Sequence, residues 1–162
     1  VVSERFSKIG SSVEIIETDL VEFFNNYISY MKKRIPKSVQ LNMEFINQPL
    51  NASINAPLFS WVIENIIKNA ADAMEGKGKI YLSLEKQQNN IVIKVKDNGK
   101  GVPSSIQKTI FQPGYTTKDR GWGLGLSLAK RIVEGHHNGK IYIASSKKNI
   151  ETVVEIILPS SK

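Results

Sequence analysis

Two asparagines and an aspartate lie at helical spacing in the segment Trp61–Met74. Asn65, Asn69 and Asp72 fall at i, i+4 and i+7, so on a helix they share one polar stripe. The apolar residues of the segment form a face beside this stripe rather than opposite it. Amide and carboxylate groups at such a border could bind a ligand, or they could hydrogen-bond to neighbouring loops. The solvated side of the helix is then expected to carry Glu64, Lys68, Ala71 and Glu75.

A glycine-rich segment, Asp97-Asn98-Gly99-Lys100-Gly101, follows a predicted strand. Its glycines let the backbone turn and approach a ligand closely, and they leave Asp97 at the rim of the core. A buried carboxylate needs donors. The exocyclic amine of adenine is a suitable donor, whereas guanine presents a carbonyl oxygen there. Leaving such a group unpaired costs about 1–3 kcal/mol, which would favour adenine. The alternative is an ordinary turn, because this pattern is common.

A second glycine-rich segment, Gly121-Trp122-Gly123-Leu124-Gly125-Leu126, leads from a loop into a predicted helix. Glycines at a helix start expose backbone N–H groups, and the helix dipole adds partial positive charge, a combination that suits phosphates. The segment is not a P-loop, and it does not follow a strand as a dinucleotide-binding motif would. Alone, it is weak support for a phosphate site.

Residues 102–121, between these two segments, lack periodicity and are rich in proline and glycine. A structureless stretch of this length in a small domain is usually a lid or a binding loop. Phe111 and Tyr115 could anchor it to the core, as in any anchored loop. Two hydroxyls and a cation are available in it for a terminal phosphate, on Thr116, Thr117 and Lys118.

Hydrophobic periodicity predicts the elements that must position these residues. Helices are expected from Thr18 or Asp19 to Pro36, from Asn55 to Gly76, and from about Leu124 onward. Strands are expected over residues 13–17, 39–46, 80–84, 91–95, 140–144 and 152–158, the last four as two hairpins. Three main helices on one face of a mixed, mostly antiparallel sheet of about five strands make an α+β two-layer sandwich.

The composition excludes several classes of site. The 162 residues contain no cysteine and only two histidines, so a disulfide framework or a protein-ligated zinc site is not expected. The histidines, His136 and His137, are predicted to be exposed turn residues. The net charge of +7 is dispersed along the chain, so no nucleic acid partner is expected. No apolar run reaches the ~20 residues of a membrane span, and the domain is expected to be cytoplasmic, without direct membrane contact.

The four motifs in this order resemble the ATP-binding catalytic domain of two-component sensor histidine kinases, in the superfamily that includes gyrase, Hsp90 and MutL proteins. The resemblance covers about Leu50 to Pro159, and it implies the Bergerat-type ATP-binding fold with a mobile ATP lid. Residues 5–10 also resemble the end of the second dimerization helix of such kinases. Residues 1–11 are therefore expected to be the tail of that helix, and residues 12–162 the ATP-binding catalytic domain.

The resemblance also implies a cofactor, Mg²⁺·ATP, and a role for each motif. Asn69 would ligate the metal, and Asn65 would support a phosphate or a metal-bound water. Asn65 and Lys118 are the residues expected to take part in catalysis. Asp97 would read adenine, and Thr152 matches a water-linked adenine contact. The complete set of expected ATP-binding residues is Asn65, Asn69, Asp97, Gly99, Gly101, Thr116, Thr117, Lys118, Gly121, Gly123, Leu124, Gly125, Leu126 and Thr152.

The reaction implied is transfer of the γ-phosphoryl group of ATP to a histidine on dimerization helices absent from this chain, followed by relay to a response regulator. The parent protein is expected to be a homodimer, and its anchoring in the inner membrane is left open. Gyrase-type relatives carry a Glu in place of Asn65, and an amide cannot take a proton from water. Many relatives carry a Lys in place of Asp72. The alternatives are an ATP-driven switch of the gyrase, Hsp90 or MutL type and a nucleotide-sensing module without kinase activity.

Overall fold

The computed structural model describes residues 13–45, 48–113 and 125–161. Its elements in the first half are β1 (Ile16–Asp19), α2 (Leu20–Lys33), β2 (Val39–Phe45), β3 (Asn51–Ile54), α3 (Ala56–Ala73) and β4 (Gly78–Gln87). They are followed by β5 (Asn90–Asp97), two short 3-10 helices η1 (Ser104–Ile106) and η2 (Thr109–Phe111), α4 (Gly125–Lys130), its π-helical continuation η3 (Arg131–His136), β6 (Lys140–Lys147) and β7 (Glu151–Pro159).

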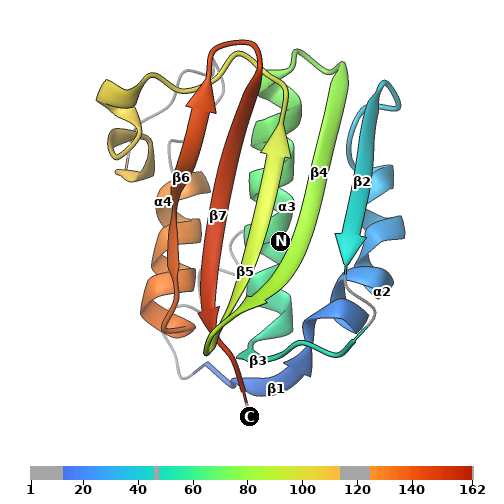
Figure 1. Cartoon of the computed structure of the whole chain (residues 1–162), viewed down its shortest axis with the longest axis vertical. Coiled ribbons are helices and arrows are strands. Elements are labelled where there is room, and N and C mark those ends of the chain that lie inside the picture. The colour runs from blue at the N-terminus through green and yellow to red at the C-terminus, as the bar shows by residue number, and fades with distance from the viewer. Residues whose placement is uncertain (1–12, 46–47, 114–124, 162) are drawn as a thin grey trace.

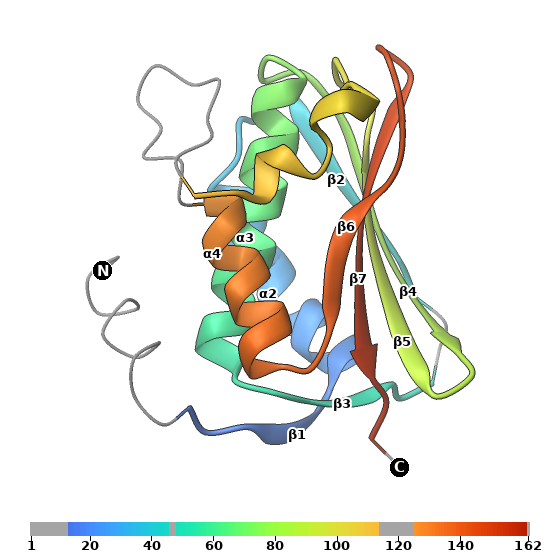
Figure 2. The same ribbon diagram turned by 90° about the vertical axis from the view of Figure 1, so that its left-hand side faces the viewer.

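The main sheet has five strands and packs against a layer of helices (Figure 1). The strand order is β2-β4-β5-β7-β6; β2 and β4 are parallel, and the other neighbours are antiparallel. Figure 2 shows α2, α3 and α4 on the same face of this sheet. The predicted two-layer α+β sandwich with a mixed, mostly antiparallel sheet is therefore confirmed. No helix in the described ranges is both long and apolar enough to cross a membrane.

A second, two-stranded sheet pairs β1 with β3 below the helices (Figure 2). The sequence did not predict β3, because its four residues are too few for an alternating pattern. The first strand was expected at residues 13–17 and lies instead at Ile16–Asp19, where it pairs with β3. Asp19 caps α2 by accepting a hydrogen bond from the Val21 N–H at 3.0 Å.

Helix α3 lies in the middle of the helical layer and carries the polar stripe. Asn55 caps it, since its side-chain oxygen accepts from the Leu58 N–H at 3.0 Å, and Pro57 occupies the first turn. The apolar side chains of α3 are buried in the hydrophobic core: Leu58, Phe59, Val62, Ile63, Ile66, Ile67 and Ala70. Packing of this face fixes the direction in which the stripe beside it projects.

His137 is buried, so the prediction that both histidines are exposed turn residues is wrong for it. Its Nε2 accepts from the Asn55 N–H at 3.0 Å, and its Nδ1 lies 2.9 Å from the Ile132 carbonyl oxygen. The ring therefore carries its proton on Nδ1 and is neutral. The prediction failed because the end of η3 meets the start of α3, where the Asn55 N–H needs an acceptor.

Glu64 is also buried, although it was expected on the solvated side of α3. Helix α2 covers that side, and Glu64 lies 2.7 Å from Arg34 Nε, 3.1 Å from Lys68 Nζ and 3.4 Å from the Tyr27 hydroxyl. Burial acts to raise the pKa of Glu64, but the two cations outweigh it and hold that pKa below its usual value. Ala71, assigned to the same side, is buried as well.

Candidate functional site

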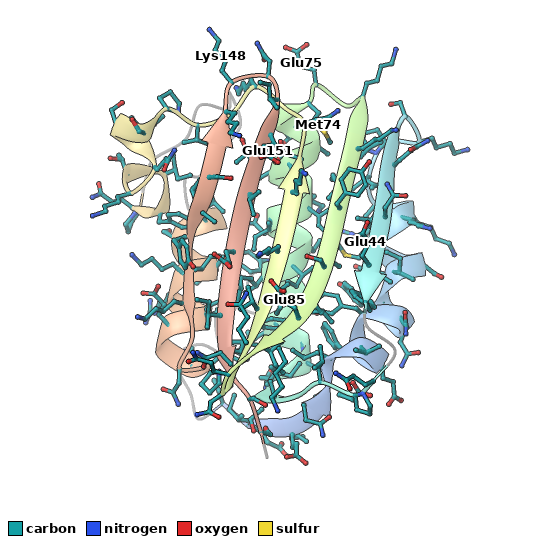
Figure 3. The ribbon with its side chains drawn as sticks, viewed as in Figure 1. Glu44, Met74, Glu75, Glu85, Lys148 and Glu151 are labelled. Atoms are coloured by element: carbon teal, nitrogen blue, oxygen red, sulfur yellow. The ribbon has the colours of Figure 1, made fainter. Side chains whose placement is uncertain are left out.

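Several candidate residues meet at the end of the sheet where α3 and β5 finish. Figure 3 labels residues at this end, with Met74 and Glu75 after α3 and with Lys148 and Glu151 at the turn between β6 and β7. The segment after β5 is tied to both sides: the Lys100 N–H donates to the Ala73 carbonyl at 3.1 Å, and the Val102 N–H donates to Ser146 Oγ at 2.8 Å. The first glycine-rich segment is thus held between the end of α3 and the β6–β7 hairpin.

Asp97, the last residue of β5, is only 5% exposed. Its Oδ1 accepts from the Gly99 N–H at 2.8 Å. Burial raises the pKa of this carboxyl, and the Gly99 hydrogen bond opposes the rise. A carboxylate has about four acceptor positions, so Asp97 retains capacity for a donor brought by a ligand.

Glycine is needed at positions 99 and 101 for different reasons. A Cβ at Gly99 would lie 2.7 Å from the Ala73 carbonyl oxygen and 2.9 Å from Asp97 Oδ1, which real contacts do not allow. Gly101 has φ of +87°, a conformation that other residues rarely adopt, and a Cβ there would lie 3.0 Å from Ser146 Oγ. The backbone between them therefore passes close to α3 and β6 without side chains intervening.

Asn65 brings the polar stripe of α3 into contact with the start of α4. A Cβ at Gly125 would lie 2.8 Å from both Nδ2 and Oδ1 of Asn65. Within the described ranges, the Asn65 Nδ2 atom is shielded from solvent and has no hydrogen-bond partner. Such a donor normally has an acceptor, so this amide could donate to a bound anion. Asn69 and Asp72 follow on the same stripe, half-buried and exposed respectively.

Thr152 lies directly opposite Asp97 in the pairing of β7 with β5, and it is buried. Its Oγ1 lies 2.9 Å from Ser146 Oγ. Ser146 was not among the predicted site residues, because a serine pair in a strand carries no recognisable signal. Pairing it opposite Thr152 could have revealed it, but the register of β6 contains an irregularity between Ile143 and Ser145.

Several expected site residues lie outside the described ranges, and the structure does not place them. They are Thr116, Thr117, Lys118, Gly121, Gly123 and Leu124, together with the loop anchor Tyr115, the part of the expected lid from residue 114 onward and the expected helix tail. Phe111 is buried, as expected of a loop anchor. Leu126 is half-buried and packs against the core. The described loop residues 102–113 also contain η1 and η2, which the sequence did not predict.

The side chains present suit a Mg²⁺ ion bound largely through water and phosphate. In the described part of the chain, no cluster of three His, Cys, Asp or Glu residues could hold a metal ion alone. The stripe of α3 offers amide oxygens and one carboxylate. These are hard ligands of the kind that Mg²⁺ accepts when waters and a nucleotide phosphate complete its octahedral shell.

The chain is similar to known proteins along most of its length. A family model described as "Histidine kinase-, DNA gyrase B-, and HSP90-like ATPase" matches residues 55–162. The chain is 37% identical over 148 residues to "Sensor histidine kinase YvrG" of Bacillus subtilis (strain 168), an alignment that covers 86% of this chain and 25% of that protein. The chain thus spans no more than about a quarter of the first curated relatives it matches.

Solved structures of histidine kinases are also similar to this chain. The nucleotide-free catalytic domain of histidine kinase ThkA superimposes with a TM-score of 0.80 at 28% identity, over 91% of this chain and 96% of that one. ThkA in complex with the response regulator protein TrrA gives a TM-score of 0.77 at 25% identity, over 91% of this chain and 42% of that one. The family model covers two thirds of the sequence and includes both Asn65 and Gly125. The chain therefore belongs to the family of histidine kinase-, DNA gyrase B- and HSP90-like ATPases.

Proposed function

We propose that this domain binds Mg·ATP and transfers its γ-phosphoryl group to a histidine on dimerization helices of the same protein. The observation that carries the proposal is the Asn65 Nδ2 atom, which is shielded from solvent, has no hydrogen-bond partner among the described residues and lies against the start of α4. An amide donor beside the first turn of a helix suits a phosphate. Asp97 is the last residue of β5, and the segment that follows it is bonded to the end of α3. Its carboxylate suits the adenine amine at the other end of the nucleotide.

Each described residue then has a role that its surroundings support. Asp97 accepts from the adenine amine, and Asn65 donates to a phosphate oxygen or a metal-bound water. Asn69 provides an oxygen ligand to Mg²⁺, which when bound neutralises charge on the phosphates. Catalysis is then mainly positioning and charge neutralisation. Because Asn65 cannot act as a base, an activated water is not generated there, and transfer to another group is favoured over hydrolysis.

The remaining roles concern residues outside the described ranges and the rest of the protein. We assign Thr116, Thr117 and Lys118 to the terminal phosphate, and Gly121, Gly123 and Leu124 to the phosphate-binding turn. The similarity to ThkA, which was solved in complex with a response regulator protein, supports relay to a receiver domain. We also propose a cytoplasmic location and a homodimeric parent protein, as in a two-component kinase.

Nucleotide titration tests the site directly. Asp97→Ala should weaken ATP binding while leaving the already weak GTP binding little changed, and Asn69→Ala should remove most of the gain in affinity that Mg²⁺ gives. Asn25→Ala, an exposed asparagine on α2, is a matched control and should bind as the wild type does. Equal effects of Asp97→Ala on ATP and GTP would contradict the assignment of Asp97 to adenine.

A phosphorylation assay distinguishes phosphoryl transfer from ATP hydrolysis and from nucleotide binding alone. The domain mixed with a separate dimerization fragment should place phosphate on the histidine of that fragment, and little on itself. Steady ATP hydrolysis without transfer would favour the switch-type ATPases of the same family. Binding with neither transfer nor hydrolysis would favour a nucleotide-sensing module.

A further inference from the structure

Ser146 connects two parts of the proposed site through one hydroxyl group. The Val102 N–H donates to Ser146 Oγ at 2.8 Å, and Ser146 Oγ lies 2.9 Å from Thr152 Oγ1. Thr152 in turn lies opposite Asp97 in the sheet register. Two contacts therefore connect the backbone after Gly101 to Thr152, the residue paired with the buried Asp97.

An irregularity in β6 places Ser146 on this face of the sheet. Tyr142 is paired with Glu155 and Ile143 with Val154, but Ser145, not Ala144, is paired with Val153. Side chains alternate between faces along a strand, so without the extra residue Ser146 would share the outer face with Tyr142. The bulge turns Ser146 inward, to the face that carries Thr152 and Asp97. Bulges often re-aim one side chain in this way.

We infer that Ser146 is a positioning residue that directs the hydroxyl proton of Thr152 toward the adenine base. A serine hydroxyl has one proton and two acceptor positions. Since Ser146 Oγ accepts from the Val102 N–H, its own O–H is polarised and is the better donor of the pair. Donation to Thr152 Oγ1 leaves the Thr152 proton free to point to the space beside the Asp97 carboxylate.

This arrangement extends the base preference, and it depends on the proposed function. The Watson–Crick edge of adenine presents the exocyclic amine next to N1, which is an acceptor. Asp97 accepts from the amine, and Thr152 donates toward N1, either directly or through one water. Guanine presents a carbonyl oxygen and an N–H at these two places, so both contacts would be mismatched. Ser146 thus acts on specificity without touching the nucleotide.

The test compares ATP with 1-deaza-ATP, in which a C–H replaces N1 and the amine is kept. Ser146→Ala should weaken ATP binding about three- to tenfold, the size of one hydrogen bond. It should change 1-deaza-ATP binding less than about twofold, because that ligand has no acceptor to lose. Ser145→Ala, on the adjacent outward-facing serine, should leave both affinities unchanged. Equal losses for both nucleotides, or no loss for either, would overturn the inference.

A second variant covers the case in which Ser146→Ala does not fold. Thr152→Val keeps the shape of the side chain and removes its hydroxyl, and it should show the same selective loss for ATP. Where both variants fold, the affinity of the double variant for ATP should equal that of the single variant with the lower affinity, since both substitutions remove the same contact. A wild-type domain that binds neither nucleotide would instead contradict the proposed function.

Discussion

Replacing Gly125 by alanine should displace the Asn65 amide and weaken Mg·ATP binding without unfolding the domain. The new Cβ would lie 2.8 Å from both terminal atoms of Asn65 and 3.2 Å from its Cγ, closer than the 3.4–4 Å of ordinary contacts. The backbone of Gly125 is not in the left-handed region, so alanine can adopt it. The strain therefore falls on the Asn65 side chain, which can rotate away.

The magnitude follows from the contact that Asn65 would lose. A hydrogen bond to a charged group contributes about 1.5–3 kcal/mol, which corresponds to an increase of about 10- to 150-fold in the dissociation constant. The stability of the folded domain should change much less than the affinity for ATP. Alanine is favoured over glycine within a helix by up to about 1 kcal/mol, and Gly125 is the first residue of α4. The melting temperature should therefore stay close to that of the wild type.

Calorimetric titration with Mg·ATP measures this effect, and the chain offers a matched control. Gly135 lies in η3, the continuation of the same helix, and a Cβ there would have no neighbour within 4 Å. Gly135→Ala should bind ATP as the wild type does. In an Asn65→Ala background, Gly125→Ala should cost little more affinity, because the group it displaces is gone. A full additional loss in that background would refute a mechanism through Asn65.

Three further predictions use the other buried polar groups. Burial lowers the pKa of His137, so the unfolded chain binds the proton more readily and stability should fall as pH drops below about 6.5. Urea unfolding should show a flatter pH dependence for His137→Gln than for the wild type. Asp97→Asn should raise the melting temperature at pH 7, because the raised pKa of Asp97 means that its buried charge destabilises the folded state. The gain should be smaller at acidic pH, where Asp97 is protonated. ATP binding should be at least about tenfold weaker. Glu64→Gln should lower the free energy of unfolding by about 1–2 kcal/mol, measured in urea, while leaving ATP affinity unchanged.

Elements with long, regular patterns were predictable from the sequence. Helix α3 and the β4–β5 hairpin show clear periodicity and lie where it placed them, with Asn55 as the helix cap. These features depend on neighbours in the chain. The strand β3 was not predicted, because it is too short for a local pattern and forms by pairing with β1, which lies much earlier in the sequence.

Burial of single polar residues was not predictable, because it depends on distant partners. Glu64 is covered by Arg34, 30 residues before it, and His137 accepts from Asn55, 82 residues before it. No local rule identifies either pair. The inward orientation of Ser146 was not predictable for a related reason. One extra residue in β6 reverses the alternation of inward and outward side chains from which its face would have been assigned. The polar stripe itself was recognisable, since helical spacing alone brings its members together.

Adjacent residues on α3 show how a structural polar group differs from a functional one. Glu64 is buried, and two cations and a hydroxyl contact it within the fold, so its charge is already satisfied. Asn65, the next residue, faces α4 with a buried amide nitrogen that no other described residue accepts. Both groups interrupt an apolar helix, but only the second leaves a hydrogen bond for an external acceptor to complete. The unsatisfied group, rather than the buried charge, therefore marks the surface where a ligand gains most from binding.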